Sequence, residues 1–182
     1  MPLTRAEKKT LLELARASLE AAVKGAQSPD PDFGASSPLG RTGGAFVTFH
    51  IGEDLRGCIG MIMSDKPVYQ TVMDMAAAAA MHDTRFVPIT PAELGAIDIE
   101  ISLLTPLRQV TSIDEIEPGR HGLYIIKGRR SGLLLPQVAL ECDFDTEEFL
   151  DQTCMKAGLR PGCWRDGQAA IFIFEAEIIN EE

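Results

Sequence analysis

The sequence predicts an α+β fold: a single domain of two lobes in which pseudo-duplicated ββαβ units share one core, with an additional helix at the N-terminus. Several short segments alternate apolar and polar residues, which is typical of half-buried strands. Other segments repeat apolar residues every three or four positions, which is typical of amphipathic helices. The same order of segments occurs twice, at an offset of about 75 residues, which indicates an internal repeat.

The N-terminal helix is predicted from its ends. Thr4 and Glu7 have the spacing of a capping box, in which each side chain accepts a hydrogen bond from the other residue's backbone amide. Apolar residues then recur on one helical face, and Gly25 is a typical residue to end the helix.

A surface segment is predicted to follow. Residues 27–44 are rich in Ser, Pro, Gly and Asp, and we expect Phe33 and Leu39 to hold them against the protein. The whole chain, 1–182, is expected to form one domain, because 182 residues suffice for one ordinary hydrophobic core and are too few for two independent domains.

The first unit of the repeat is predicted from residue 45 onward. Residues 45–51 and 55–62 are expected to be strands joined by a turn at 52–54. A helix should begin at Ser64-Asp65-Lys66-Pro67, with the proline in its first turn. Residues 97–103 then alternate as a clear strand.

The second unit repeats this plan. Strands are predicted at 122–127 and 132–135, a helix from Asp145 to near Gly158, and one strand at 169–178. A chance recurrence in an ordinary α+β chain is the alternative explanation. The duplication pairs Gly57 with Gly132, Ile59 with Leu134, and Glu100 with Glu175.

Composition and charge exclude several classes of protein. The formal net charge is −10, which disfavours binding to a nucleic-acid backbone, and no apolar run has the length of a membrane span. The start of the chain lacks the apolar region of a signal peptide. The four cysteines include no C-x-x-C pair, so we expect reduced thiols and a cytoplasmic location.

The segment Leu55-Arg56-Gly57-Cys58-Ile59-Gly60 is the strongest candidate for chemistry. In a regular strand, Arg56 and Cys58 would point to the same face, about 7 Å apart. The guanidinium would then favour the thiolate form of the cysteine, or would bind a substrate carboxylate or phosphate. The alternative is that Cys58 is a small buried hydrophobic residue and Arg56 an ordinary surface cation.

The same hexapeptide resembles the signature of the AMMECR-one domain family, whose bacterial and archaeal members are called AmmeMemoRadiSam system protein A. Other stretches are similar to the family in the same order, and the resemblance covers almost the whole chain. Thr84 stands where the family usually has proline, which loosens this loop and puts the direction of Arg85 in doubt. The matching stretches are 82–88, Glu93-Leu94, 99–104, 119–122, 134–141, Phe149-Leu150, Cys154 and 156–159.

The resemblance implies an α+β fold with a larger and a smaller lobe and a cleft near the hexapeptide. It implies no particular reaction. It also implies that the gene lies near genes for a Memo-like protein and a radical S-adenosylmethionine protein, which are therefore expected partners. A small-molecule or peptide ligand is the other expected partner.

Two further residues are candidate partners of the cysteine. His121, in a glycine-rich turn, is the natural general base for Cys58, since a Cys–His pair is the minimum for thiol nucleophilic catalysis. Glu100 would orient His121 or pair with Arg56 if its strand neighbours that of Cys58. The alternatives are a histidine that hydrogen-bonds its own turn and a glutamate on a solvated face.

Gln137, Glu141 and Arg85 are candidate substrate-binding residues. Gln137 and Glu141 lie about one helical turn apart and would face one side of a short helix, where capping is the alternative role. Arg85 would contribute to an anion-binding cleft, or would form a local ion pair with Asp83. The chain has no metal-ligand spacing and no nucleotide-binding loop, so we expect no cofactor.

Two functions remain open from the sequence. The first is an enzyme that uses the Cys58, Arg56 and His121 cleft on a small anionic or carbonyl substrate. The second is a non-catalytic binding or scaffold module for a partner protein or metabolite, in which substitution of Cys58 by serine is tolerated.

Overall fold

The structure, a computed structural model, describes residues 3–181. Its helices are α1 (Arg5–Lys24), α2 (Val68–Met81), α3 (Pro136–Glu141) and α4 (Thr146–Lys156), with 3₁₀ turns η1 (Pro38–Gly40), η2 (Leu94–Ala96) and η3 (Ile113–Glu115). Its strands are β1 (Ala45–Ile51), β2 (Asp54–Met61), β3 (Ile97–Leu104), β4 (Arg108–Gln109), β5 (Gly122–Lys127), β6 (Arg130–Leu134), β7 (Ala170–Phe174) and β8 (Ala176–Asn180). No helix among residues 3–181 has both the length and the apolar character needed to cross a membrane.

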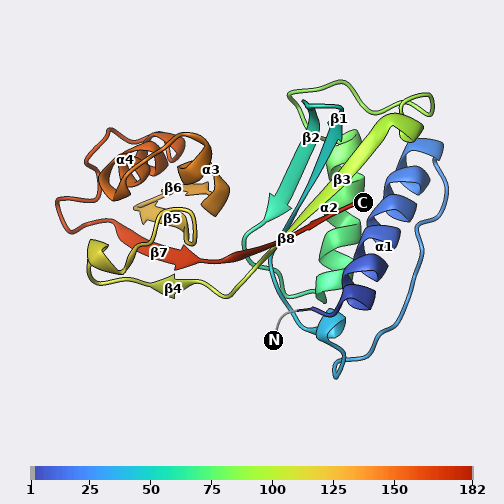
Figure 1. The fold of residues 1–182 in the computed structure, drawn as a ribbon, viewed down its shortest axis with the longest axis horizontal. Coiled ribbons are helices and arrows are strands. Elements are labelled where there is room, and N and C mark those ends of the chain that lie inside the picture. Colours follow the sequence, from blue (N-terminus) through green and yellow to red (C-terminus); the bar gives the residue numbers. More distant parts are fainter. Residues whose placement is uncertain (1–2, 182) are drawn as a thin grey trace. The chain divides into compact units, whose positions relative to one another are not determined.

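The fold is a single-domain α+β fold that contains two compact units and two sheets (Figure 1). Unit 1 comprises the described residues up to Leu104 together with 177–181, and unit 2 comprises Thr105–Ala176. The sheet of unit 1 has the order β2-β1-β3-β8, and that of unit 2 has the order β4-β7-β5-β6.

The predicted ββαβ repeat is confirmed by this topology. In each unit the first strand of a hairpin lies between the second strand and the strand that follows the helical segment: β2-β1-β3 in one and β6-β5-β7 in the other. The fourth strands are exchanged. β4 follows β3 in the chain but pairs with β7, and β8 follows β7 but lies beside β3.

Gly57 and Gly132 occupy corresponding places in the two units. A Cβ atom on Gly57 would lie 2.7 Å from the carbonyl oxygen of Ala79, in α2. A Cβ atom on Gly132 would lie 2.3 Å from the backbone nitrogen of Ala157, at the end of α4. Helix backbone therefore packs directly on the second strand of each hairpin, and only glycine fits there without a shift.

Each unit has its own cluster of buried hydrophobic side chains, which corrects the prediction of one shared core. In unit 1, α1 and α2 pack on one face of the sheet, where Val47, Phe49, Ile99 and Ile101 are buried (Figure 1). In unit 2, side chains from β5, β7, α3 and α4 form the second cluster. Strand alternation identifies which face is apolar, but it does not show which elements cover that face.

The N-terminal elements agree with the predictions. Thr4 and Glu7 form the capping box, and Gly25 ends α1 with a φ of 65°. In the 27–44 segment, the Phe33 ring packs edge-on against Tyr69 at 5.1 Å between centroids, and Leu39 is buried in the core of unit 1. Both residues therefore hold the segment against the protein.

Some predicted boundaries differ from the structure. The single strand predicted at 169–178 is divided, because β7 ends at Phe174 in one sheet and β8 begins at Ala176 in the other. Pro67 precedes α2 as its N-cap residue instead of lying within the first turn.

A disulfide between Cys154 and Cys163 corrects the prediction of four reduced thiols. Cys154 lies in the last turn of α4, and the loop after it turns back through Gly158 and Gly162, both with positive φ. This turn brings the two Cα atoms to 5.9 Å. The loop conformation that pairs the cysteines could not be inferred from their spacing. Cys58 and Cys142 are free.

Candidate functional site

The candidate hexapeptide lies on β2, an edge strand of the unit 1 sheet. Its pairing with β1 is antiparallel and contains a bulge: Phe49 faces Gly57 and His50 faces Leu55, so Arg56 is an extra residue. The bulge interrupts the regular alternation from which we predicted that Arg56 and Cys58 share a face. The two side chains accordingly have different partners: Cys58 contacts Thr48, and Arg56 contacts Glu93.

The backbone of Cys58 is held from the open edge of the sheet by the loop after α2. The Cys58 amide donates to Asp83 Oδ2 at 2.8 Å, and the Cys58 carbonyl oxygen accepts from Arg85 at 3.1 Å. Asp83 and Arg85 also bind each other, through Arg85 Nε and Oδ1 at 2.9 Å and through a second contact at 2.7 Å. An edge strand normally leaves such backbone groups unpaired, so this loop protects the edge at Cys58.

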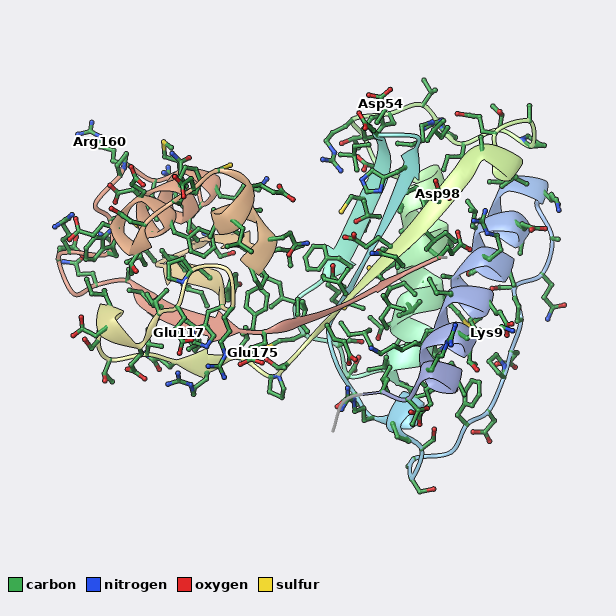
Figure 2. All side chains as sticks on the ribbon, in the orientation of Figure 1. Lys9, Asp54, Asp98, Glu117, Arg160 and Glu175 are labelled. Carbon is green, nitrogen blue, oxygen red and sulfur yellow. A yellow bond between two sulfur atoms is a disulfide. The ribbon has the colours of Figure 1, made fainter. Side chains whose placement is uncertain are left out.

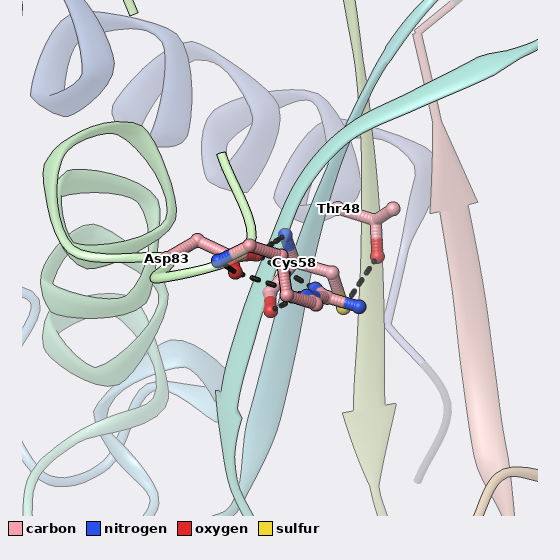
Figure 3. Close-up of polar contacts among 4 residues, drawn as sticks. Thr48, Cys58 and Asp83 are labelled. Atoms are coloured by element: carbon pink, nitrogen blue, oxygen red, sulfur yellow. Dashed lines mark hydrogen bonds and ion pairs between the residues drawn. The ribbon is translucent and has the colours of Figure 1, made fainter. Parts of the chain in front are cut away.

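The thiol of Cys58 accepts a hydrogen bond from the hydroxyl of Thr48, its cross-strand neighbour on β1, with Oγ1 and Sγ 3.3 Å apart (Figure 3). Cys58 is partly exposed. Thr48 itself is buried. The sulfur is therefore oriented by a neighbouring side chain, on a residue that is partly exposed.

The guanidinium beside Cys58 belongs to Arg85, whose terminal nitrogen lies 3.1 Å from the Cys58 carbonyl oxygen. Hydrogen bonds to the carboxylate of Asp83 are the largest cause that raises the pKa of Arg85, so the guanidinium stays charged. A cation adjacent to Cys58, which we predicted for Arg56, is therefore supplied by another residue.

Arg56 is engaged elsewhere. Its Nε donates to Glu93 Oε1 at 2.7 Å, and a second nitrogen donates to the carbonyl oxygen of Pro88 at 3.5 Å. The guanidinium carbon also lies 6.0 Å from the centre of the Phe86 ring, which Arg85 approaches to 5.4 Å. Arg56 thus fastens the 83–93 loop to β2.

Both carboxylates of this cluster are stabilised in the ionised form. The hydrogen bonds from Arg85 hold the pKa of Asp83 far below its usual range. The hydrogen bond from Arg56, followed by those from Thr90, lowers the pKa of Glu93 to about 2. Each guanidinium is consequently paired with a carboxylate, and a substrate anion would compete with that partner.

The glycines around Cys58 have packing roles. Gly57 lies under α2, as described above. A Cβ atom on Gly60 would lie 2.1 Å from the ring of Phe46, its cross-strand partner, so the ring covers this position. Close approach of protein groups, not of a ligand, explains both glycines.

Glu100 lies in the same cross-strand row as Cys58 but not on a neighbouring strand. Thr48 pairs with Cys58 on one side and with Glu100 on the other, because β1 lies between β2 and β3. This corrects the assumption that the two strands are adjacent. All three residues lie on the face opposite α1 and α2, with the Cα atoms of Cys58 and Glu100 about 10 Å apart by the usual strand spacings.

The other predicted site residues belong to unit 2. His121 is buried, and its Nδ1 accepts a hydrogen bond from the Glu117 amide at 3.0 Å, within its own turn. Gln137 and Glu141 lie on α3, the predicted short helix, where Gln137 is partly buried and Glu141 is exposed. Their roles with Cys58 remain predictions.

Three features of the site were not predicted from the sequence. They are the contact of Thr48 with the sulfur, the binding of Asp83 to the Cys58 backbone, and the pairing of Glu93 with Arg56. Thr48 carries no motif of its own, and only the strand register brings it to the sulfur. Asp83 and Glu93 do lie in stretches that resemble the family, which was the available signal. No group of three or more His, Cys, Asp or Glu residues within 3–181 has an arrangement suited to a metal ion.

The fold and the glycine-flanked cysteine define a class of α+β protein in which two ββαβ units exchange their fourth strands. One known protein family matches this chain. The AMMECR1 family model matches residues 12–179, so the chain belongs to the AMMECR1 family.

Similar proteins come from several archaea. A protein of Methanothermobacter thermautotrophicus is 41% identical, with 100% of this chain and 97% of that protein covered. Protein TK0174 of Thermococcus kodakarensis is 41% identical, with 94% and 89% covered. The crystal structure of Uncharacterized Protein PH0010 from Pyrococcus horikoshii is similar with a TM-score of 0.90 and 36% identity, covering 99% of this chain and 94% of that one.

Proposed function

We propose that the chain is a thiol-dependent enzyme in which Cys58 is the nucleophile and a small carbonyl compound is the substrate. The observation that carries this proposal is the arrangement at Cys58: Asp83 and Arg85 hold its backbone, while Thr48 donates a hydrogen bond to its sulfur. A reactive thiol needs a fixed direction of attack, and these contacts support one because they hold both the backbone and the sulfur of Cys58.

The proposed step is attack of the Cys58 thiolate on the substrate carbonyl carbon. A carbon–sulfur bond forms while the carbonyl π electrons move to the oxygen. When these electrons return, the bond from the carbonyl carbon to the leaving group breaks, and the leaving group takes the proton that the thiol gave up. Water then attacks the thioester, which releases the acid and regenerates the thiol. The guanidinium of Arg85, whose side chain is 54% exposed, would stabilise the negative charge that develops on the oxygen. Glu100, in the same cross-strand row as Cys58, would accept the thiol proton in this proposal.

The cellular setting is part of the same proposal. We propose a cytoplasmic protein that works with a Memo-like protein and a radical S-adenosylmethionine protein. The Cys154–Cys163 disulfide is compatible with this setting only if it is protected from cellular reductants. Both cysteines are buried, which supports such protection.

The alternative proposal is a non-catalytic binding or scaffold module. Its specific support is that Arg56 and Arg85 are each paired with a carboxylate and tie one loop to β2. Such pairing is typical of a structural role and leaves less cationic charge for a substrate. A partner protein would then bind the surface around Cys58 without chemistry at the sulfur.

The two proposals are distinguished by trapping an acyl-enzyme. Intact mass spectrometry would follow the protein mixed with a panel of small acyl thioesters and activated esters, with Cys58→Ser and Cys142→Ser as matched variants. The enzyme proposal predicts an adduct that forms and then disappears in the wild type and in Cys142→Ser, and that is absent from Cys58→Ser. A permanent adduct, or one shared equally with Cys142, would support the binding module.

A further inference from the structure

A hollow lies in unit 1, away from the cysteine strand. Its volume is about 830 Å³, within the range of ligand-binding pockets. The first half of α1 forms one wall, residues 94–98 form one end, and residues 178–181 of β8 and its extension form the other wall. Leu12, Ile97 and Ile178 give it an apolar lining, and Ile178 is 38% exposed.

The wall formed by β8 is an open strand edge. β8 ends the order β2-β1-β3-β8, so one of its edges has no neighbouring strand among residues 3–181. The backbone groups on such an edge can pair with an added strand. The hollow therefore offers main-chain hydrogen-bonding groups as well as apolar side chains.

Ion pairs hold α1 beside this strand at both ends. Lys8 of α1 binds Glu177 at 2.8 Å, and Arg16 of α1 binds Glu181 through Nε at 3.1 Å. Arg16 also donates to the carbonyl oxygen of Leu94 at 3.1 Å, which fixes the end of the hollow. The groove between helix and strand is thus formed before any ligand binds.

The charge of the hollow differs from that of the chain. Its lining contains four cations, Arg5, Lys8, Lys9 and Arg16, and three carboxylates, Glu13, Asp98 and Glu181; with Glu177, which binds Lys8, the charges balance (4 − 4), whereas the chain carries −10. Lys9 has a 77% exposed side chain and contacts Glu13 only at 3.7 Å. Figure 2 shows Lys9 on α1 and Asp98 on β3.

We propose that this groove binds an extended peptide segment with alternating acidic and apolar side chains, which adds to β8 as a further strand. A groove between an open strand edge and a helix is a recurrent geometry for binding extended peptides. Alternation places one set of side chains against the apolar lining and the other toward the cations. The peptide belongs to a partner protein, and its binding is independent of the chemistry proposed for Cys58.

Fluorescence anisotropy with labelled peptides tests this inference. The probes are two ten-residue peptides, one alternating Glu and Val and one alternating Lys and Val, together with a Glu–Val peptide N-methylated at alternate residues. We expect saturable binding of the first peptide, at least tenfold weaker binding of the second, and a similar loss on methylation. Higher salt should weaken the binding, because surface charges are screened.

Two variants on the same helix locate the site. Lys9→Glu should weaken binding of the Glu–Val peptide at least fivefold, while Lys24→Glu, an exposed change outside the groove, should leave it unchanged. Equal binding of both charged peptides, no binding, or equal effects of the two variants would overturn the inference. Displacement of the peptide by dodecanoate would agree with it, whereas dodecanoate binding without peptide binding would assign the hollow to small amphipathic anions instead.

Discussion

The hydroxyl of Thr48 donates to the sulfur of Cys58 across the β1–β2 pair, at 3.3 Å. Because one hydrogen bond to a thiolate is lost when this hydroxyl is removed, Thr48→Val should slow alkylation of Cys58 by iodoacetamide about three- to tenfold, corresponding to roughly 1 kcal/mol. Peptide mapping of the alkylated protein measures the rate. The control is Thr10→Val, because the Thr10 hydroxyl donates to the Ala6 carbonyl oxygen within α1. This substitution should leave the alkylation rate unchanged.

The buried carboxylate of Asp83 should stabilise the fold. Asp83→Asn replaces an acceptor of the Cys58 amide and leaves Arg85 without its ion partner, so we expect a loss of about 1–3 kcal/mol in the free energy of unfolding. Urea denaturation measures it. The matched variant is Asp32→Asn, at an exposed carboxylate that accepts from the Gly34 amide, and it should change stability by less than about 0.5 kcal/mol. An equal loss of unfolding free energy in the two variants would contradict a specific stabilising role of Asp83.

The Glu93–Arg56 pair should make stability depend on acid pH. Its hydrogen bonds lower the pKa of Glu93 to about 2 from an ordinary value of 4.5. Since the folded state has the lower pKa, the pair's contribution is fully present above pH 4.5 and is lost as the pH falls toward 2. The difference in unfolding free energy between the wild type and Glu93→Gln should therefore shrink over that window. Glu53→Gln, on the exposed hairpin turn, should show no such trend.

The disulfide predicts a definite thiol count. In denaturant without reductant, two thiols should react with Ellman's reagent, and four should react after reduction. Reduction should lower the free energy of unfolding by about 2–3 kcal/mol, as expected for a loop of roughly ten residues. The variant with Cys154→Ser and Cys163→Ser should match the reduced protein. Four reactive thiols before reduction would contradict the assigned pair.

Local patterns predicted much of the fold correctly. The capping box at Thr4 and Glu7 and the β3 alternation depend on neighbouring residues, whose spacing is visible in the sequence. The ββαβ repeat was also predictable, because its hairpins and helices recur in the same order. The exchange of β4 and β8 between the sheets was not, since it depends on which distant strand pairs with which.

The candidate site shows the same division. The sequence identified Cys58 from its flanking glycines, but the partners of its side chain depend on register and on a bulge. The extra residue at Arg56 breaks the alternation, and the loop after α2 brings Arg85 to the Cys58 carbonyl oxygen while Arg56 binds Glu93. Arg56 therefore does not share a contact with Cys58, while Arg85 forms the ion pair with Asp83 that the sequence left open as one of its two roles.

The central claim, that the folded environment makes Cys58 a reactive nucleophile, is tested most directly by its alkylation rate at pH 7 in Cys142→Ser protein, measured without reductant so that the Cys154–Cys163 disulfide stays closed. We predict that Cys58 reacts faster in the folded protein than in the same protein unfolded in urea, although folding partly shields it. A folded rate equal to or below the unfolded rate would contradict it.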